Sequence, residues 1–144
     1  MRLTHKKTEL EYTHVHADMY HAVVAGTWVA ASDTNQMYQL LLYNSSNAVN
    51  NEISFKLYHK AGSYTLEFLC ITDVNYGITT ISIDGVSQGT VDLYSAAIAY
   101  NVLKTLAVTF LTSGLHTINF KVTSKNASAT GYYLGLTRIR IKAT

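Results

Sequence analysis

Eleven tyrosines and one tryptophan are the side chains of this sequence whose chemistry best suits binding. A tyrosine combines a flat apolar ring with a hydroxyl group, so it can stack on a sugar ring or fill a protein interface. Several tyrosines follow loop-like segments. The predicted binding or interface residues are Trp28, Asn75, Tyr76, Asn126, Tyr132 and Tyr133. The alternative is that at least half of the tyrosines pack across strands inside the core.

The segment TSKNASATGYYLG (123–135) places two of these tyrosines directly after a run of small polar residues. Small polar residues suit a loop whose backbone turns tightly or lies close to a neighbour. Tyr132 is expected to begin the strand that closes the chain, and adjacent strand residues point to opposite faces, so at most one tyrosine of the pair is buried in the core. A structural or intersubunit role is favoured for this loop, with sugar contact as the alternative.

Histidines raise the question of a metal site. His14 and His16 share one face of a possible strand, with Asp18 and His21 nearby. A metal site needs three or four converging ligands, and the HVH spacing is one at which two ligands commonly occur on a strand. The alternative, an edge strand with polar residues turned outward, is favoured, so no metal and no other cofactor is predicted.

The carboxylates are scattered along the chain rather than paired. A glycosidase needs two of them facing each other across the scissile bond, and no local pairing suggests this. The sequence also lacks a nucleophile elbow, a metalloprotease helix motif and a phosphate-binding loop. We therefore predict that the protein is not an enzyme.

Composition narrows the choice of partners. Charged residues make up 14% of the chain and the net charge is +2, whereas about 25% charged residues is typical. A surface with few charges often lies against other copies of the chain, so a homo-oligomer is expected. With no basic run beyond Lys6–Lys7, nucleic-acid binding is not expected. Cys70 stands among apolar residues and is predicted to be buried.

No segment of the sequence is apolar for long enough to cross a membrane, and residues 1–10 lack a stretch of signal-peptide length. We therefore expect the protein to be made in a cytoplasm without Sec-type export, and we expect no membrane insertion.

Alternation with period two dominates the sequence and predicts β-strands. In the segment 116–124, His116, Ile118, Phe120 and Val122 share one face and polar residues share the other. Further strands are expected at 36–43, 52–60, 63–72, 104–111 and 137–144, with a hairpin over 77–94 that turns at Asp84–Gly85. Residues 68–71 are apolar on both faces, which indicates burial on both sides. The segment 95–103 is interpreted as a loop or a single turn.

These elements predict an all-β protein, an antiparallel β-sandwich of jelly-roll type with about eight strands. Residues 1–30 are expected to form an N-terminal arm or edge strand, and residues 31–144 to form the sandwich.

Three stretches, 64–95, 99–102 and 111–141, together resemble a known family. They contain GITTISIDG followed by GTVDLY, and LTSGLHTINF followed by KNASATGYY. This pattern resembles the β-sandwich domains of bacteriophage tail-fibre and other virion proteins, which are similar in architecture to carbohydrate-binding modules. The resemblance covers roughly residues 60–144 and concerns turns and core positions rather than a catalytic motif.

The resemblance implies a virion structural protein that decorates a capsid or forms part of a tail or fibre. Its partners would be other copies of itself, expected as a homotrimer, and other virion proteins, and its location would be the virion. The alternative is a carbohydrate-binding module that recognises host or other cell-surface glycans without catalysis.

Overall fold

The computed structural model describes residues 12–16 and 21–144, and within these ranges the chain forms eleven strands and no helix. The strands are β1 (Tyr12–His16), β2 (His21–Ala25), β3 (Trp28–Ser32), β4 (Leu40–Asn44), β5 (Glu52–His59), β6 (Gly62–Thr72), β7 (Ile78–Ile83), β8 (Val86–Asp92), β9 (Ala99–Phe110), β10 (Gly114–Ser124) and β11 (Gly135–Ala143). None of the described residues belongs to a helix that could span a membrane.

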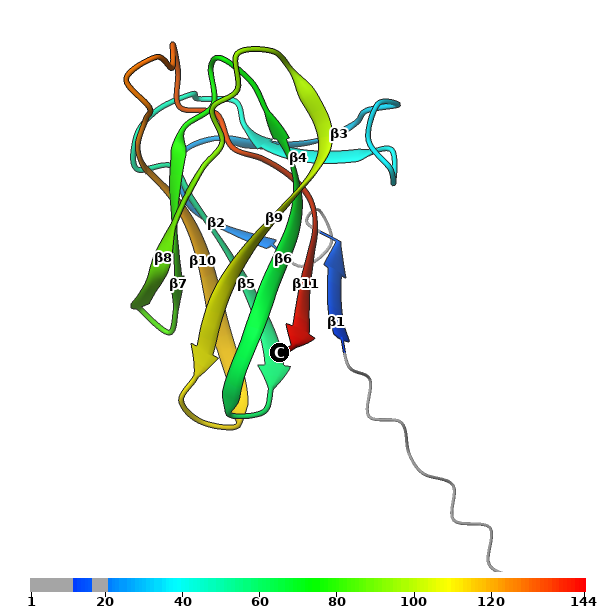
Figure 1. The fold of residues 1–144 in the computed structure, drawn as a ribbon, viewed down its shortest axis with the longest axis vertical. Coiled ribbons are helices and arrows are strands. Elements are labelled where there is room, and N and C mark those ends of the chain that lie inside the picture. The colour runs from blue at the N-terminus through cyan, green and yellow to red at the C-terminus, as the bar shows by residue number, and fades with distance from the viewer. Residues whose placement is uncertain (1–11, 17–20) are drawn as a thin grey trace, which may run out of the picture.

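Two antiparallel sheets stack face to face (Figure 1). One has the order β3-β4-β11-β6-β9, with β1 added beside β11, and the other has the order β2-β5-β10-β7-β8. The predicted all-β sandwich is confirmed. The strands number eleven among the described residues instead of about eight, in part because three short strands lie within residues 12–32.

The core lies between the sheets and follows the alternation seen in the sequence. On β10, His116, Ile118, Phe120 and Val122 are all buried, as predicted. The ring of Phe120 meets Phe55 and Phe68 edge to face, with ring centroids 5.9 and 5.4 Å apart. Because Phe55 is on β5 and Phe68 is on β6, this aromatic cluster joins the two sheets.

Strand β6 is buried on both faces from Phe68 to Ile71, again as predicted. It lies between β11 and β9, and its outer face includes Glu67, which pairs with Arg140 of β11. Cys70 is fully buried, and this burial raises the pKa of its thiol to about 12. The thiol therefore stays protonated and serves as a small core residue.

The Asp84–Gly85 turn between β7 and β8 is confirmed. Both residues have positive φ, 50° for Asp84 and 83° for Gly85, as a two-residue type I′ hairpin turn requires. A glycine or a short polar residue tolerates this backbone, which explains why a two-residue signal was enough to locate the hairpin.

Two expected boundaries are wrong. Strand β9 begins at Ala99, so residues 99–103 are extended rather than a loop or turn, because β6 offers pairing partners as far as Thr72. The closing strand β11 begins at Gly135 rather than Tyr132. The Tyr132 amide instead donates to the side chain of Asn47 at 2.7 Å, which keeps this residue in the loop.

The N-terminal part of the chain contributes to both sheets where it is described. Strand β1 pairs with β11, β2 with β5 and β3 with β4. Of the arm or edge strand expected over residues 1–30, residues 1–11 and 17–20 lie outside the described ranges. The proposed division of the chain at residue 31 stays a prediction about domain organisation.

Candidate functional site

Three connecting loops lie together at one end of the sandwich, the upper end in Figure 1: residues 73–77 between β6 and β7, 93–98 between β8 and β9, and 125–134 between β10 and β11. Their backbones bond to one another. The Thr130 amide donates to the Val74 carbonyl oxygen at 2.8 Å, and the Ser95 amide donates to the Asp73 carbonyl oxygen at 3.2 Å. The loops therefore form one connected assembly supported by two rigid sheets.

The Tyr133 backbone connects two of these loops directly. Its amide donates to the Asn75 carbonyl oxygen, and its carbonyl oxygen accepts from the Gly77 amide, both at 3.0 Å. Gly131 allows this close approach, because a Cβ atom there would stand only 2.8 Å from the carbonyl oxygen of Asn75. The small residues of the 125–134 segment thus let the loop lie against its neighbour.

Asn44 anchors the same loop from β4. Its side chain is fully buried, its amide nitrogen donates to the Tyr132 carbonyl oxygen at 2.9 Å, and its carbonyl oxygen accepts from the Leu134 amide at 2.7 Å. Its amide nitrogen also reaches Asn51 Oδ1 at 3.1 Å. Backbone groups that no neighbouring strand can satisfy are thereby paired through one asparagine.

A pocket of about 290 Å³ opens where β4 meets these loops, and we call it the apical pocket. Its lining comprises three phenols, one carboxylate, one amide and two aliphatic side chains: Tyr43, Tyr76, Tyr133, Asp73, Asn75, Leu41 and Ile98. Ligand pockets in proteins typically combine apolar and aromatic side chains with a few polar groups that orient the ligand, and the apical pocket has this composition.

The polar groups of the apical pocket have unused hydrogen-bonding capacity. Asn75 Oδ1 is buried and has no partner within the described part of the chain. Asp73 Oδ1 accepts from the Val74 amide at 2.7 Å, whereas its second carboxylate oxygen has no described partner. Because buried polar groups in proteins are almost always paired, the unpaired Asn75 Oδ1 makes this pocket a candidate ligand site.

The aromatic part of the pocket is built by Tyr76 and Tyr133. Their ring centroids are 6.0 Å apart and the rings are tilted by 43°. Tyr76 is only 8% exposed, and burial, together with the nearby Asp73 carboxylate, raises the pKa of its hydroxyl. The Tyr76 hydroxyl therefore stays protonated and can donate a hydrogen bond.

Three of the six residues predicted from the sequence, Asn75, Tyr76 and Tyr133, meet in the apical pocket. The structure places Trp28 elsewhere, at the start of β3, where its indole N–H donates to the Ala25 carbonyl oxygen at 3.0 Å and its ring packs against the core. A binding role for any of the six stays a prediction.

Asn126 and Tyr132 also lie outside the lining of the apical pocket. The Asn126 amide nitrogen donates to Asp92 Oδ2 at 2.8 Å, which ties the loop to the end of β8. The Tyr132 ring packs against the core, and the Lys125 ammonium lies 5.1 Å from its centroid. Both side chains help to shape the loop that positions Tyr133.

Four lining residues were not singled out from the sequence: Leu41, Tyr43, Asp73 and Ile98. Asp73 could have been predicted as a lining residue from the sequence, because it is two residues before Asn75 in the same turn-rich segment. The sequence pattern for Leu41 and Tyr43 is weaker, since it shows only that they share a strand face two residues apart. Ile98 comes from a loop with no local signature.

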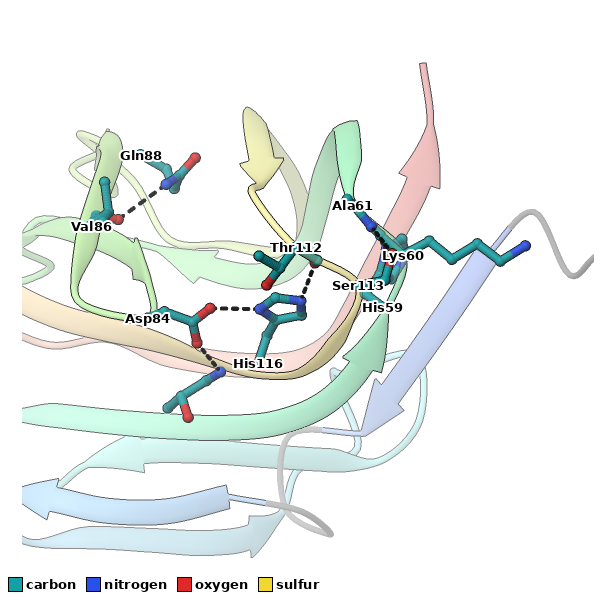
Figure 2. Close-up of polar contacts among 10 residues, drawn as sticks. His59, Lys60, Ala61, Asp84, Val86, Gln88, Thr112, Ser113 and His116 are labelled. Carbon is teal, nitrogen blue, oxygen red and sulfur yellow. Dashed lines mark hydrogen bonds and ion pairs between the residues drawn. The ribbon is translucent and has the colours of Figure 1, made fainter.

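A second polar cluster lies at the opposite end of the sandwich (Figure 2). The ring of His116, which is 2% exposed, places Nδ1 at 2.6 Å from Asp84 Oδ2 and Nε2 at 2.8 Å from the Thr112 carbonyl oxygen. Asp84 Oδ1 accepts from the Thr117 amide at 2.9 Å. Both imidazole nitrogens face acceptors, so this cluster connects two turns and leaves no free group for chemistry.

Acidification tests this cluster. The hydrogen bonds from His116 and from the Thr117 amide hold the pKa of Asp84 below its ordinary value. A carboxylate with a lowered pKa in the folded state stabilises the fold above its unfolded-state pKa of about 3.9, and this contribution is lost as the pH falls through the folded-state value. Urea midpoints measured between about pH 6 and pH 2 should therefore fall less steeply for Asp84→Asn than for the wild type. Parallel slopes would contradict the expectation.

The described residues offer no pair of carboxylates across the apical pocket, since Asp73 is its only acidic lining residue. They also contain no group of three or more His, Cys, Asp or Glu residues that could hold a metal ion. The backbone register sets His14 opposite Arg140 and His16 opposite Arg138. Their side chains lie outside the described part of the chain, so the absence of a metal there stays a prediction.

No protein-family model matches the chain, and no curated protein does either. Solved structures do match. A xanthan lyase from Paenibacillus shares 26% identity over 91% of this chain at a TM-score of 0.78, but the match covers only 13% of the lyase. The CBM36-1 domain of a multidomain xylanase from the hindgut metagenome of Trinervitermes trinervoides matches at a TM-score of 0.66 and 15% identity, over 92% of this chain and 98% of the domain.

A family 35 carbohydrate-binding module from Clostridium thermocellum matches at a TM-score of 0.66 and 19% identity, over 91% of this chain and 98% of the module. The sandwich therefore has the fold of carbohydrate-binding modules, and this part of the sequence-based resemblance is confirmed. The virion origin, the virion location and the homotrimer gain no support from these matches. They stay predictions.

Proposed function

We propose that this chain is a carbohydrate-binding module that holds a saccharide in the apical pocket. One observation carries the proposal: Asn75, Tyr76 and Tyr133 come together with the Asp73 carboxylate in a single pocket whose polar groups keep unused hydrogen-bonding capacity. The likeness of the fold to carbohydrate-binding modules supports it.

The chemistry of the pocket matches the chemistry of a sugar ring. The C–H groups of a sugar form an apolar face that packs on a tyrosine ring, while its hydroxyl groups need hydrogen-bond partners. Tyr133 is half-buried at the pocket and offers such a ring, and Asp73 and Asn75 offer acceptors. A volume of about 290 Å³ is at the small end for ligand sites, which suits one sugar unit better than a long segment of chain.

The proposed role is binding without turnover. Glycoside hydrolysis uses two carboxyl groups roughly 5–9.5 Å apart, one on each side of the bond that breaks. The apical pocket contains Asp73 and no second acidic lining residue. A lone carboxylate in this position can orient hydroxyl groups but cannot act as both acid and base or nucleophile.

Tyr133→Ala tests the proposal. The wild type is expected to be retarded in native gels that contain one or more soluble polysaccharides from a panel of xylans, mannans, galactans and xanthan. Affinity should fall about 10-fold in the variant, because aromatic contacts of this kind contribute about 1 kcal/mol or more. Isothermal titration with the matching oligosaccharide gives the dissociation constants.

Tyr58→Ala is the matched control, because Tyr58 is 76% exposed on β5 of the other sheet and does not line the pocket. Its affinity should equal that of the wild type. Each titration is run with calcium and with EDTA. Failure of the wild type to bind any polysaccharide of the panel under either condition would overturn the proposed function, and equal losses in both variants would place the binding site elsewhere.

A further inference from the structure

We infer that the apical pocket selects a neutral sugar and that Asp73 is the residue that excludes uronic acids and sulfated sugars. This inference rests on the proposed function and specifies its ligand class. Two features of the pocket support it: the sign of its charge and the direction of its unused hydrogen bonds.

The charge of the pocket is negative. Asp73 is the only charged residue of its lining, and no cation lines it within the described part of the chain. Two basic side chains outside the pocket, Lys125 and Arg138, are engaged with other groups. Lys125 lies over the ring of Tyr132, and Arg138 donates to the Tyr38 hydroxyl at 2.7 Å. An anionic ligand would therefore face a carboxylate with no counter-charge, an arrangement that disfavours binding.

Two of the unused polar atoms, Asn75 Oδ1 and the second carboxylate oxygen of Asp73, are acceptors only. The buried Asn75 Oδ1 accepts hydrogen bonds and cannot donate, and the same holds for both oxygens of the ionised Asp73 carboxylate. A sugar hydroxyl can donate to both, whereas a carboxylate or sulfate oxygen cannot. The ligand must therefore present free hydroxyl groups on the side that faces Asp73 and Asn75.

The phenols complement this pattern. None of the hydroxyls of Tyr43, Tyr76 and Tyr133 has a partner within the described residues. They can donate to a ring oxygen or to a hydroxyl oxygen, which neutral and acidic sugars share. Discrimination between the two classes thus falls on Asp73 and Asn75 rather than on the aromatic residues.

The experiment compares methyl glycosides that differ only at C6: glucose with glucuronate, galactose with galacturonate and mannose with mannuronate. Saturation-transfer NMR and calorimetric titrations give affinities for the wild type, Asp73→Asn and Glu52→Gln. The wild type should bind the neutral member of at least one pair about 10-fold more tightly than its uronate. Asp73→Asn should bind the neutral sugar about 10-fold more weakly, because a charge-assisted hydrogen bond is lost, and should no longer discriminate between the members of the pair.

Glu52→Gln removes the same charge from β5 of the other sheet while an oxygen remains to accept from the Asn119 amide, so it should leave both affinities unchanged. Salt provides a test that does not depend on folding of a variant. Raising the concentration of NaCl from about 50 mM to about 500 mM should strengthen uronate binding to the wild type and leave neutral binding unchanged, since salt screens like-charge repulsion.

The outcomes separate this inference from the proposed function. Uronate affinity equal to or above that of the neutral sugar, whether with calcium or with EDTA, would overturn the inference while leaving carbohydrate binding intact. Weaker uronate binding at high salt, or full discrimination retained by Asp73→Asn, would overturn the inference in the same way. If the wild type binds neither the neutral sugars nor the uronates, and none of the polysaccharides of the panel, the proposed function itself is overturned.

Discussion

Phe120→Ala is expected to lower the free energy of unfolding by about 3–5 kcal/mol. Phe120 is completely buried, and its ring contacts Phe55 of β5 and Phe68 of β6 edge to face. Truncation removes a large apolar side chain and leaves a cavity where the two sheets meet. The rigid strands on both sides can close that cavity only in part, so most of the lost packing energy is not recovered.

Equilibrium unfolding in urea measures this loss, with far-UV circular dichroism and tyrosine fluorescence as independent probes of one transition. Leu115→Ala is the matched control, because Leu115 is on the same strand and is 58% exposed. The control should change the free energy of unfolding by no more than about 0.5 kcal/mol. Similar losses at Phe120 and Leu115 would contradict the assignment of the buried face of β10.

Asn44→Leu is expected to lower the free energy of unfolding by about 3 kcal/mol or more and to abolish saccharide binding in the apical pocket. The fully buried Asn44 side chain bonds to Asn51, to the Tyr132 carbonyl oxygen and to the Leu134 amide. Leucine has a similar size but no polar atoms, so these partners would be left buried without hydrogen bonds. Each unpaired buried group costs about 1–3 kcal/mol.

The loss of binding follows from the position of Tyr133 between the two backbone groups that Asn44 holds. Asn119→Ala is the control. Asn119 is half-buried on β10, and its side chain makes one hydrogen bond, to Glu52 at 2.6 Å. Asn119→Ala should therefore lower the free energy of unfolding by about 1 kcal/mol and leave saccharide affinity unchanged. If a folded Asn44→Leu protein keeps its saccharide affinity, the loop that Asn44 holds does not form the binding site.

The apical pocket and the lower polar cluster differ in how their polar groups are used. At the lower end, both ring nitrogens of His116 and both oxygens of Asp84 have partners, so the cluster stabilises the fold. In the apical pocket, Asn75 and Asp73 keep atoms without partners among the described residues. Departures from complete pairing are expected where a protein binds something, and this contrast distinguishes the two ends of the sandwich.

Local patterns in the sequence were sufficient for most of the individual strands. The alternation in the segment 116–124 predicted which side chains of β10 are buried, since side chains along a strand alternate between its faces. The apolar run over residues 68–71 predicted a strand buried on both faces, and Asp84–Gly85 predicted a hairpin turn. These features depend only on residues close in sequence, so a single chain is enough to detect them.

The same local reasoning located the tyrosines and asparagines of the loops, but only the tertiary structure decided which of them share a pocket. Tyr43, Asp73 and Tyr133 are far apart in sequence, and they meet because β4 and β6 both pair with β11. Likewise, Ala99 begins a strand only because β6 extends beside it. Strand pairing between distant segments depends on the packing of the whole core, and the period of a single segment carries no information about its neighbour.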